Sequence, residues 1–398
     1  MAAEPITPLP ASLPARIPPQ LGVLMTAVIS FGFAHSAYFL LPKYLELELH
    51  ADPAQIGTYM SAMWFTNVAV VPFAGLWIDR AGRRPFAYLG AAVLLAACLG
   101  FLAVDRLGPL LLALRIAHGV AFTFFFVATQ TLAADLSPPE KLGQVLGYYG
   151  SGFVITNAAA PAAAEWLAGR AGWSAVFAAT AALSLVPLVL LAFVREHRPL
   201  RHEHAAPAPG ILETLLRPGF PRVLATSALA GVTFAAAFTF HQPFALSLGI
   251  ERVSDFFVAY SITAMLVRGP LGAVADRAGR VRVTGVSLCI YAAAAFAMTQ
   301  LASLGLVVTG MAFGAAHGLF YPALNAFALE NASADVRAKV TALFNGAFNV
   351  GFSCGSLGLG FVAHGAGYTR LYALGGVCSL AALAVLPRTR ASQAPGRE

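Results

Sequence analysis

The chain has 398 residues, of which 58% are hydrophobic and only 11% are charged, and its mean hydropathy is +0.73. These values exclude an ordinary soluble domain, in which apolar residues are scarcer and charged residues commoner. The net charge of +7 would suit a nucleic-acid partner, but the placement of the basic residues argues against one.

Apolar runs recur along the whole chain, each of about 20 residues and long enough to cross a bilayer core of about 30 Å. They predict an all-α membrane protein with twelve transmembrane helices. The predicted spans are 20–42, 52–75, 85–104, 108–132, 142–166, 172–194, 220–244, 254–275, 282–302, 305–329, 338–362 and 368–387.

The proline-rich leader before the first span lacks the charged start and the cleavage site of a signal peptide, so we expect that span to be retained. With the N-terminus placed in the cytoplasm, eighteen Lys and Arg residues fall in inner segments and five in outer segments. This bias is the positive-inside rule, and it predicts an inner-membrane protein with both termini in the cytoplasm. Basic residues therefore orient the chain, and no nucleic-acid partner is expected.

The longest polar interruption divides six spans from six, and the same landmarks recur in each half. His118-Gly119 in span 4 corresponds to His317-Gly318 in span 10, and Pro42 corresponds to Pro243. Two parallel, pseudo-symmetric six-helix bundles explain this pattern. The expected segments are a leader (1–19), an N-terminal bundle (20–194), a cytoplasmic linker (195–219), a C-terminal bundle (220–387) and a cytoplasmic tail (388–398).

Two similar charged stretches are expected in the short cytoplasmic connections after spans 2 and 8. Gly82 and Gly279 are expected to take the left-handed conformation that ends a helix. Asp79 and Asp276 could each meet a helix N-terminus or an arginine at the membrane boundary. The stretches are GLWIDRAGRR (75–84) and GAVADRAGRVR (272–282).

The first of these stretches resembles the signature loop of the major facilitator superfamily, and the second resembles its weaker copy. The resemblance covers essentially the whole chain and implies two bundles that rock about a central cavity, with the two loops as a cytoplasmic gate. The candidate gate residues are Gly75, Asp79, Arg80, Gly82, Arg83, Arg84, Arg268, Gly272, Asp276, Arg277, Gly279 and Arg280.

Three further segments bear on this resemblance. Arg115 and Gly119 in span 4 resemble the family's second motif, whose arginine is associated with proton coupling. The segment 172–177 resembles the usual start of span 6. Span 5 departs from the glycine-proline signature of family antiporters, because Ala160-Pro161 is flanked by alanines. These motifs indicate the superfamily and leave the substrate open.

Ionisable residues inside a bilayer are costly and are therefore candidates for function. The helical rise places His35, His118 and His317 about 18–21 Å from the inner ends of their spans. Arg115 and His118 are three residues apart and share a helix face. Histidine can gain or lose a proton near physiological pH, so we expect proton occupancy at His35 or His118 to be linked to substrate occupancy. The alternative is a structural histidine bonded to a backbone carbonyl.

No Asp or Glu lies in the middle of spans 1, 4, 7 or 10, which favours a neutral or anionic solute over a cationic drug. Further substrate-site candidates are Tyr38, Asn157 and Gln242. Arg268 could act in the gate or reach the cytoplasm by snorkelling.

These observations predict a secondary active transporter that works by alternating access, coupled to protons and acting as an exporter. A proton-coupled importer or facilitator is the alternative within transport. A membrane scaffold or an intramembrane enzyme is the alternative of another class, and the chain has none of the enzyme motifs sought. We expect a monomer whose partners are a small solute, protons and membrane lipid, without a metal or cofactor.

Overall fold

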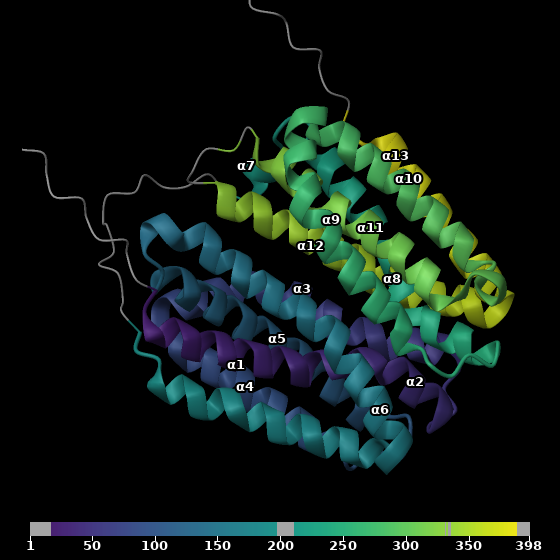
Figure 1. Cartoon of the computed structure of the whole chain (residues 1–398), viewed down its shortest axis with the longest axis horizontal. Helices are drawn as coiled ribbons and strands as arrows, with labels where there is room; N and C mark the ends of the chain where they lie inside the picture. The colour runs from purple at the N-terminus through teal and green to yellow at the C-terminus, as the bar shows by residue number, and fades with distance from the viewer. Residues whose placement is uncertain (1–16, 197–210, 331, 333–335, 388–398) are drawn as a thin grey trace, which may run out of the picture.

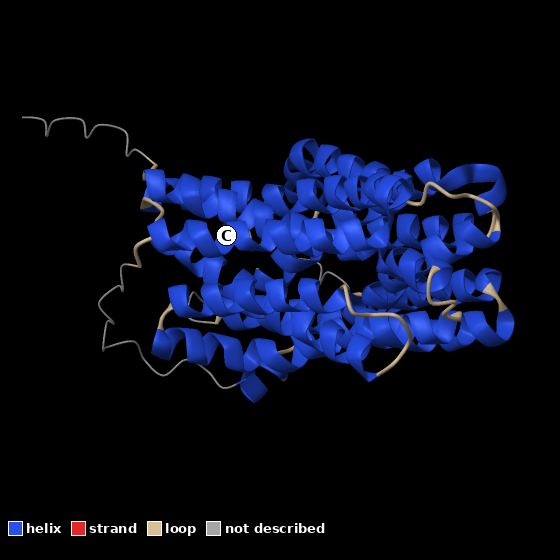
Figure 2. Cartoon of the chain, turned by 90° about the horizontal axis from the view of Figure 1, so that it is seen from below, coloured by secondary structure: helices blue, strands red, loops and turns tan. Residues whose placement is uncertain are grey.

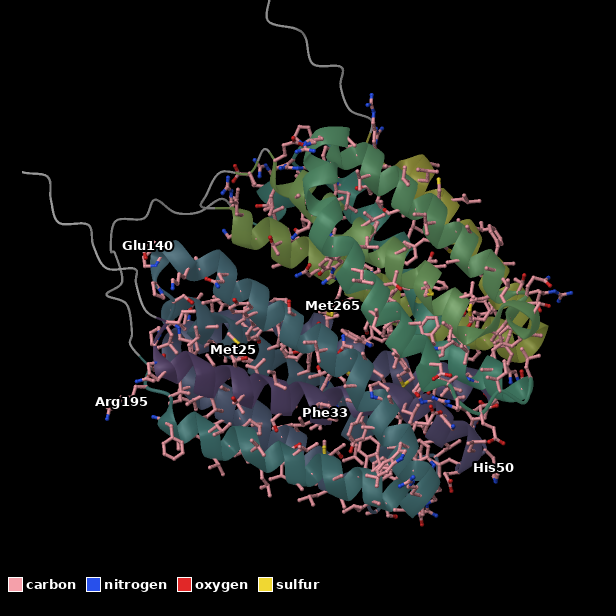
Figure 3. The ribbon with its side chains drawn as sticks, viewed as in Figure 1. Met25, Phe33, His50, Glu140, Arg195 and Met265 are labelled. Atoms are coloured by element: carbon pink, nitrogen blue, oxygen red, sulfur yellow. The ribbon has the colours of Figure 1, made fainter. Side chains whose placement is uncertain are left out.

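The structure is a computed structural model that describes residues 17–196, 211–330, 332 and 336–387. Within these residues every regular element is a helix, and Figure 2 shows the connections gathered at two ends of the molecule. Figure 3 places His50 at one end, and Glu140 and Arg195 at the other. These ends are called the His50 end and the Glu140 end below.

The helices follow the order of the predicted spans. Their bounds are α1 (Pro19–Ser36), η1 (Ala37–Leu40), α2 (Leu41–Leu47), α3 (Pro53–Ala81), α4 (Arg83–Phe101), α5 (Pro109–Asp135), η2 (Pro139–Lys141), α6 (Leu142–Leu190), η3 (Leu191–Phe193), α7 (Ile211–Leu215), α8 (Phe220–Ser247), α9 (Ser254–Ala278), α10 (Arg280–Met298), α11 (Leu301–Leu329), α12 (Arg337–Ala366) and α13 (Tyr368–Val385).

Ten continuous helical segments in the described part of the chain are long and apolar enough to cross a membrane. One of them contains α6, which carries two predicted spans that meet at a non-helical residue, Gly172. Helix α9 corresponds to a further span. Each of the twelve predicted spans therefore has a helical counterpart.

Glycines with positive φ turn the chain at matching places in the two halves. Gly82 and Gly279 have φ values of 104° and 91°, and Gly172 and Gly367 have 78° and 84°. Only glycine adopts such angles freely, because it lacks a Cβ atom. The ψ values of Gly82 and Gly279 are 158° and 126°, so these residues lie in a positive-φ region that is essentially restricted to glycine. The left-handed helical conformation that was predicted for them is wrong.

The first charged stretch lies mainly in a helix and not in a connection, contrary to the prediction. Helix α3 continues to Ala81, which makes Gly75, Asp79 and Arg80 helical and leaves Gly82 as the whole connection to α4. The apolar run ends at the hydrocarbon boundary, whereas the helix continues because its backbone hydrogen bonds do not depend on side-chain polarity. The surroundings of Gly272 and the side chain of Asp276 in α9 lie outside what the structure describes.

The helices form two bundles, which Figure 1 shows one above the other. In the first, α1 packs against α6, and α5 packs against α3 and α4. In the second, α8 packs against α12, and α11 packs against α9 and α10. The bundles contact each other through α3 with α12, α6 with α9, and α8 with α2.

Glycines let neighbouring helices approach closely, as is common in membranes. A Cβ atom at Gly351 of α12 would lie 1.8 Å from the carbonyl oxygen of Ala228 in α8. A Cβ at Gly57 of α3 would lie 2.3 Å from the carbonyl oxygen of Ser356 in α12. Backbone contacts of this kind fix the distance between helices within and between the bundles.

We predict that Gly351→Ala destabilises the protein, because its methyl group must displace the α8 backbone. Overpacking of this kind costs about 1–3 kcal/mol. Gly346→Ala on the same helix is the matched control, since no atom lies within 4 Å of its added Cβ. The unfolding temperature in detergent should be several degrees lower for Gly351→Ala than for the parent. For the control it should be unchanged or higher. Equal unfolding temperatures for the two variants would contradict the packing.

Candidate functional site

Two histidines from different helices meet inside the first bundle. Nε2 of His118 in α5 lies 2.9 Å from Nδ1 of His35 in α1. His118 is fully buried, whereas His35 keeps 3% of its surface exposed. The other ring nitrogen of His118, Nδ1, is buried and lacks a hydrogen-bond partner in the described structure.

Arg115 lies one turn from His118 on the same helix and is 1% exposed. Its Nε donates to the carbonyl oxygen of Tyr59 at 3.1 Å, and its Nη2 lies 3.5 Å from Sδ of Met63. Its Nη1 is buried without a partner. Among the described residues no carboxylate forms an ion pair with Arg115.

The position of Arg115 follows from the packing of α5 against α3. A Cβ at Gly119 would lie 2.4 Å from the carbonyl oxygen of Met63, so only glycine permits this close approach. The guanidinium one turn away is thereby brought against the α3 backbone. Arg115 is within electrostatic range of both His35 and His118. This site thus carries a fixed positive charge beside two groups that can bind protons.

Tyr38 joins this site, and Asn157 lies beside it. The ring of Tyr38 stands edge-on to His118 at 4.8 Å between centroids, and its hydroxyl lies 3.2 Å from Oγ1 of Thr180. Asn157 of α6 accepts a hydrogen bond from Ser36 at 2.8 Å, next to His35 in the chain. The structure therefore brings His35, Tyr38, Arg115 and His118 together.

His317 occupies the equivalent place in the second bundle and does not join the first site. Its Nδ1 lies 2.6 Å from the hydroxyl of Tyr291, and its ring stacks on Phe234 at 4.7 Å. A Cβ at Gly318 would approach the carbonyl oxygen of Ala264 to 3.0 Å, which parallels the contact of Gly119. Arg268 is within electrostatic range of His317, and its Nε is buried without a hydrogen-bond partner.

A chain of polar side chains links the two bundles near these sites. Asn349 of α12 donates to Oδ1 of Asn67 at 2.9 Å, and Asn67 donates to Oγ1 of Thr123 at 2.8 Å. Trp64 and Phe352 meet across the same boundary with centroids 5.1 Å apart. In the sequence these residues are indistinguishable from ordinary interhelical packing residues.

Gln242 lies at the boundary between the bundles and has no hydrogen bond to the histidine site. Its Nε2 donates to the carbonyl oxygen of Phe39 at 2.7 Å, and its Oε1 accepts from the backbone N–H of Lys43 at 3.3 Å. Lys43 also pairs with Glu165 at 2.7 Å. Lys43 was not among the predicted site residues. Its position directly after Pro42, where the first apolar run ends, was the only signal.

At the Glu140 end, the first charged stretch holds the turn between α3 and α4 in place. Arg83 pairs with Asp135 at 3.2 Å, and the backbone N–H groups of Arg83 and Arg84 donate to Glu196 at 2.9 and 3.1 Å. Glu196 thus caps the N-terminus of α4. Asp79 and Arg80 are exposed in this conformation. Sequence reasoning missed Asp135 and Glu196 because both lie far from the motif in the chain.

The structure describes only part of the second charged stretch (272–282). Arg277 and Gly279 are exposed. Arg280 donates to the carbonyl oxygen of Ala326 at 3.1 Å and lies 3.9 Å from Glu330. It therefore ties the start of α10 to the end of α11, much as Arg83 ties the start of α4 to the end of α5.

Among solved structures, the chain is similar to the nucleoside transporter NupG, with a TM-score of 0.77, 15% identity and coverage of 92% of this chain and 98% of that one. It is also similar to the human organic anion transporter MFSD10, with a TM-score of 0.68, 16% identity and coverage of 93% and 100%. At these identities the likeness shows the fold alone.

Sequence comparison gives the family. The chain is 23% identical over 312 residues to the uncharacterized MFS-type transporter YfkF of Bacillus subtilis, covering 73% of this chain and 76% of that protein. It is 28% identical over 169 residues to the multidrug resistance protein MdtL of Escherichia coli K12, covering 42% and 41%. A family model described as Major Facilitator Superfamily matches residues 22–267 and 244–398. The chain is therefore a multi-pass membrane protein that belongs to the major facilitator superfamily of transporters.

Proposed function

We propose that this protein is a proton-coupled exporter that moves a small neutral or anionic solute across the inner membrane by alternating access. The observation that carries the proposal is the hydrogen-bonded pair His35–His118 beside Arg115, which is buried without a carboxylate partner. The positive-inside bias supports a topology in which the Glu140 end and both termini face the cytoplasm.

The chemistry of the pair supports coupling. In the neutral pair, an N–H of one ring donates to the other ring. One added proton makes one imidazolium beside Arg115 and keeps this bond, whereas two added protons would place two positive charges side by side, with their ring nitrogens 2.9 Å apart. Such like charges repel strongly in a medium of low dielectric constant. An anion, or the negative end of a polar solute, would offset that repulsion. Solute binding and proton binding at this site therefore influence each other, and that influence is reciprocal.

The unpaired Nη1 of Arg115 is a hydrogen-bond donor and supports a solute that accepts hydrogen bonds. A buried donor without a partner costs free energy, so a solute that accepts its hydrogen bond would be bound more tightly. A cationic solute would meet Arg115 without a described carboxylate to balance it. These features support a neutral or anionic substrate class.

The direction of transport is supported by relatives and not by geometry. The MdtL proteins are named for multidrug resistance, and the matched region is less than half of the Escherichia coli protein. Import of a small metabolite is the second candidate, because span 5 lacks the glycine-rich signature of family antiporters. Export predicts that overproduction in an efflux-deficient bacterium lowers the cellular content of an uncharged or anionic probe, and import predicts that it raises it.

We predict that His118→Gln and His35→Gln abolish transport driven by a pH gradient but retain solute exchange at equal pH. The solute would first be identified by a thermal-shift screen at about pH 6 and about pH 8, since a ligand stabilises the state that it binds. Flux would then be measured in liposomes with His50→Asn as the matched control, because His50 is exposed at the end of the molecule. Full pH-driven flux in the double variant would refute the role of the pair.

We predict that Arg115→Met weakens binding of anionic solutes by about tenfold or more, because a hydrogen bond to a charged group is worth about 1.5–3 kcal/mol. Thermal stability should be unchanged or higher, since replacing an unbalanced buried charge with an apolar side chain removes a desolvation cost. Binding would be measured by thermal shift over a range of solute concentrations. Unchanged anion affinity in a folded variant would contradict the substrate class.

A further inference from the structure

A second cluster of charged groups lies towards the His50 end, apart from the histidine site. Glu165 of α6 is 13% exposed, and its two oxygens accept hydrogen bonds from the backbone N–H groups of Val253 and Ser254 at 2.9 and 3.0 Å. Ser254 is the first residue of α9. A carboxylate of the first bundle therefore caps a helix N-terminus of the second, where the helix dipole favours negative charge.

Lys43 completes this contact between the bundles. Its ammonium group lies 2.7 Å from Glu165 and donates to the carbonyl oxygen of Glu251 at 2.5 Å. Its backbone N–H donates to Gln242, which in turn donates to the carbonyl oxygen of Phe39. Lys43 and Glu165 thus pair within the first bundle, and together they hold the segment that leads into α9.

Other titratable and charged side chains near Glu165 come from α8, from the start of α9 and from α6 itself. From α8, His241 is fully buried and lies within electrostatic range of Glu165, with its Nε2 lacking a hydrogen-bond partner. Before and in α9, Arg252 and Asp255 pair with each other at 3.2 Å. On α6 itself, Arg170 stacks over Trp166. Lys43 is therefore the cation that pairs with Glu165 among the described residues.

We propose that Glu165 is a proton-binding group that controls the His50 end of the transporter: ionised Glu165 closes this end, and protonated Glu165 releases α9. The ionised carboxylate accepts two backbone N–H bonds and attracts Lys43. A protonated carboxyl carries an O–H donor, has no net charge for Lys43, and can no longer cap α9 with both oxygens. Nothing in the contact requires the histidine site, so the inference deepens the proposed coupling and can be tested apart from it.

The direction of the effect follows from the bonds that opening must break. Separating the bundles at the His50 end removes Glu165 from the amides of Val253 and Ser254 and removes Lys43 from the carbonyl of Glu251. Charge-assisted hydrogen bonds are the strongest of these interactions. Protonation weakens them only in the closed form, so acid shifts the population towards molecules that are open at this end. A proton arriving from that side would thus promote its own access.

The test measures the distance between the bundles at the His50 end by electron paramagnetic resonance in lipid nanodiscs. Spin labels would be placed at Arg106→Cys and Gln300→Cys, two exposed residues in connections of opposite bundles at that end, after the four native cysteines are replaced by serine. Distances would be recorded between about pH 3 and about pH 7, because a carboxylate held by Lys43 and two backbone N–H groups binds a proton only below the ordinary range of a glutamate.

We expect the open fraction of the otherwise native protein to rise at low pH. In Glu165→Gln the ratio of open to closed molecules should be about tenfold higher than in the parent at high pH. This ratio should not depend on pH. Glu165→Asp keeps the charge and should restore a pH response. Glu48→Gln is the control, because Glu48 is exposed and outside the contact.

A Glu165→Gln protein whose distances and pH response match the parent would overturn the proposal, and so would a parent that does not respond to pH. Circular dichroism and thermal unfolding of each variant would establish that it is folded. A protein that opens in acid but shows no pH-driven flux would overturn the proposed coupling and leave the role of Glu165 intact. The two failures are therefore distinguishable.

Discussion

The hydrogen bond between His35 and His118 forms inside a helix bundle, where a buried charge costs free energy, and this cost constrains the side chains around the pair. The bond joins α1 to α5, and Arg115 lies one turn from His118 with a fixed charge that no described carboxylate offsets. The bundle tolerates this arrangement because Arg115 is hydrogen-bonded to the α3 backbone, which approaches closely at Gly119. The proposed coupling would explain why the bundle keeps these costly buried groups, since together they would respond to a proton and a solute.

This site lies between two ends of the molecule that are held together by different kinds of contact. At the Glu140 end, Arg83 and Glu196 tie α4 to neighbours within its own bundle. At the His50 end, Lys43 and Glu165 contact the other bundle. Contacts within a bundle survive a rocking motion, whereas contacts between bundles must break. Alternating access would therefore place its largest electrostatic cost at Lys43 and Glu165, far in the chain from the motif residues.

Much of the fold could be predicted from the sequence because its signals are local. Apolar runs predict the spans, and recurring glycines mark the turns in both halves, as at Gly82 and Gly279. The similar depth of His35 and His118 was also accessible, because helical rise alone sets it. Their contact depends in addition on how α1 packs beside α5. Lys43 and Glu165 were not recognised as partners, since their contact with α9 depends on how two bundles face each other. Asp135 and Glu196 were missed because they lie far from Arg83 in the chain and their sequence surroundings carry no motif.

The most direct test is to count protons when a solute binds. Purified protein in a weakly buffered solution would receive the solute identified by screening, and a pH indicator would record proton uptake or release. If His35 and His118 couple the two events, binding should change the number of bound protons by about one, since the pair exchanges a single proton readily. The change should vanish when both histidines are replaced by glutamine. Solute binding without any proton uptake or release between about pH 5.5 and about pH 8.5 would contradict coupling at this site.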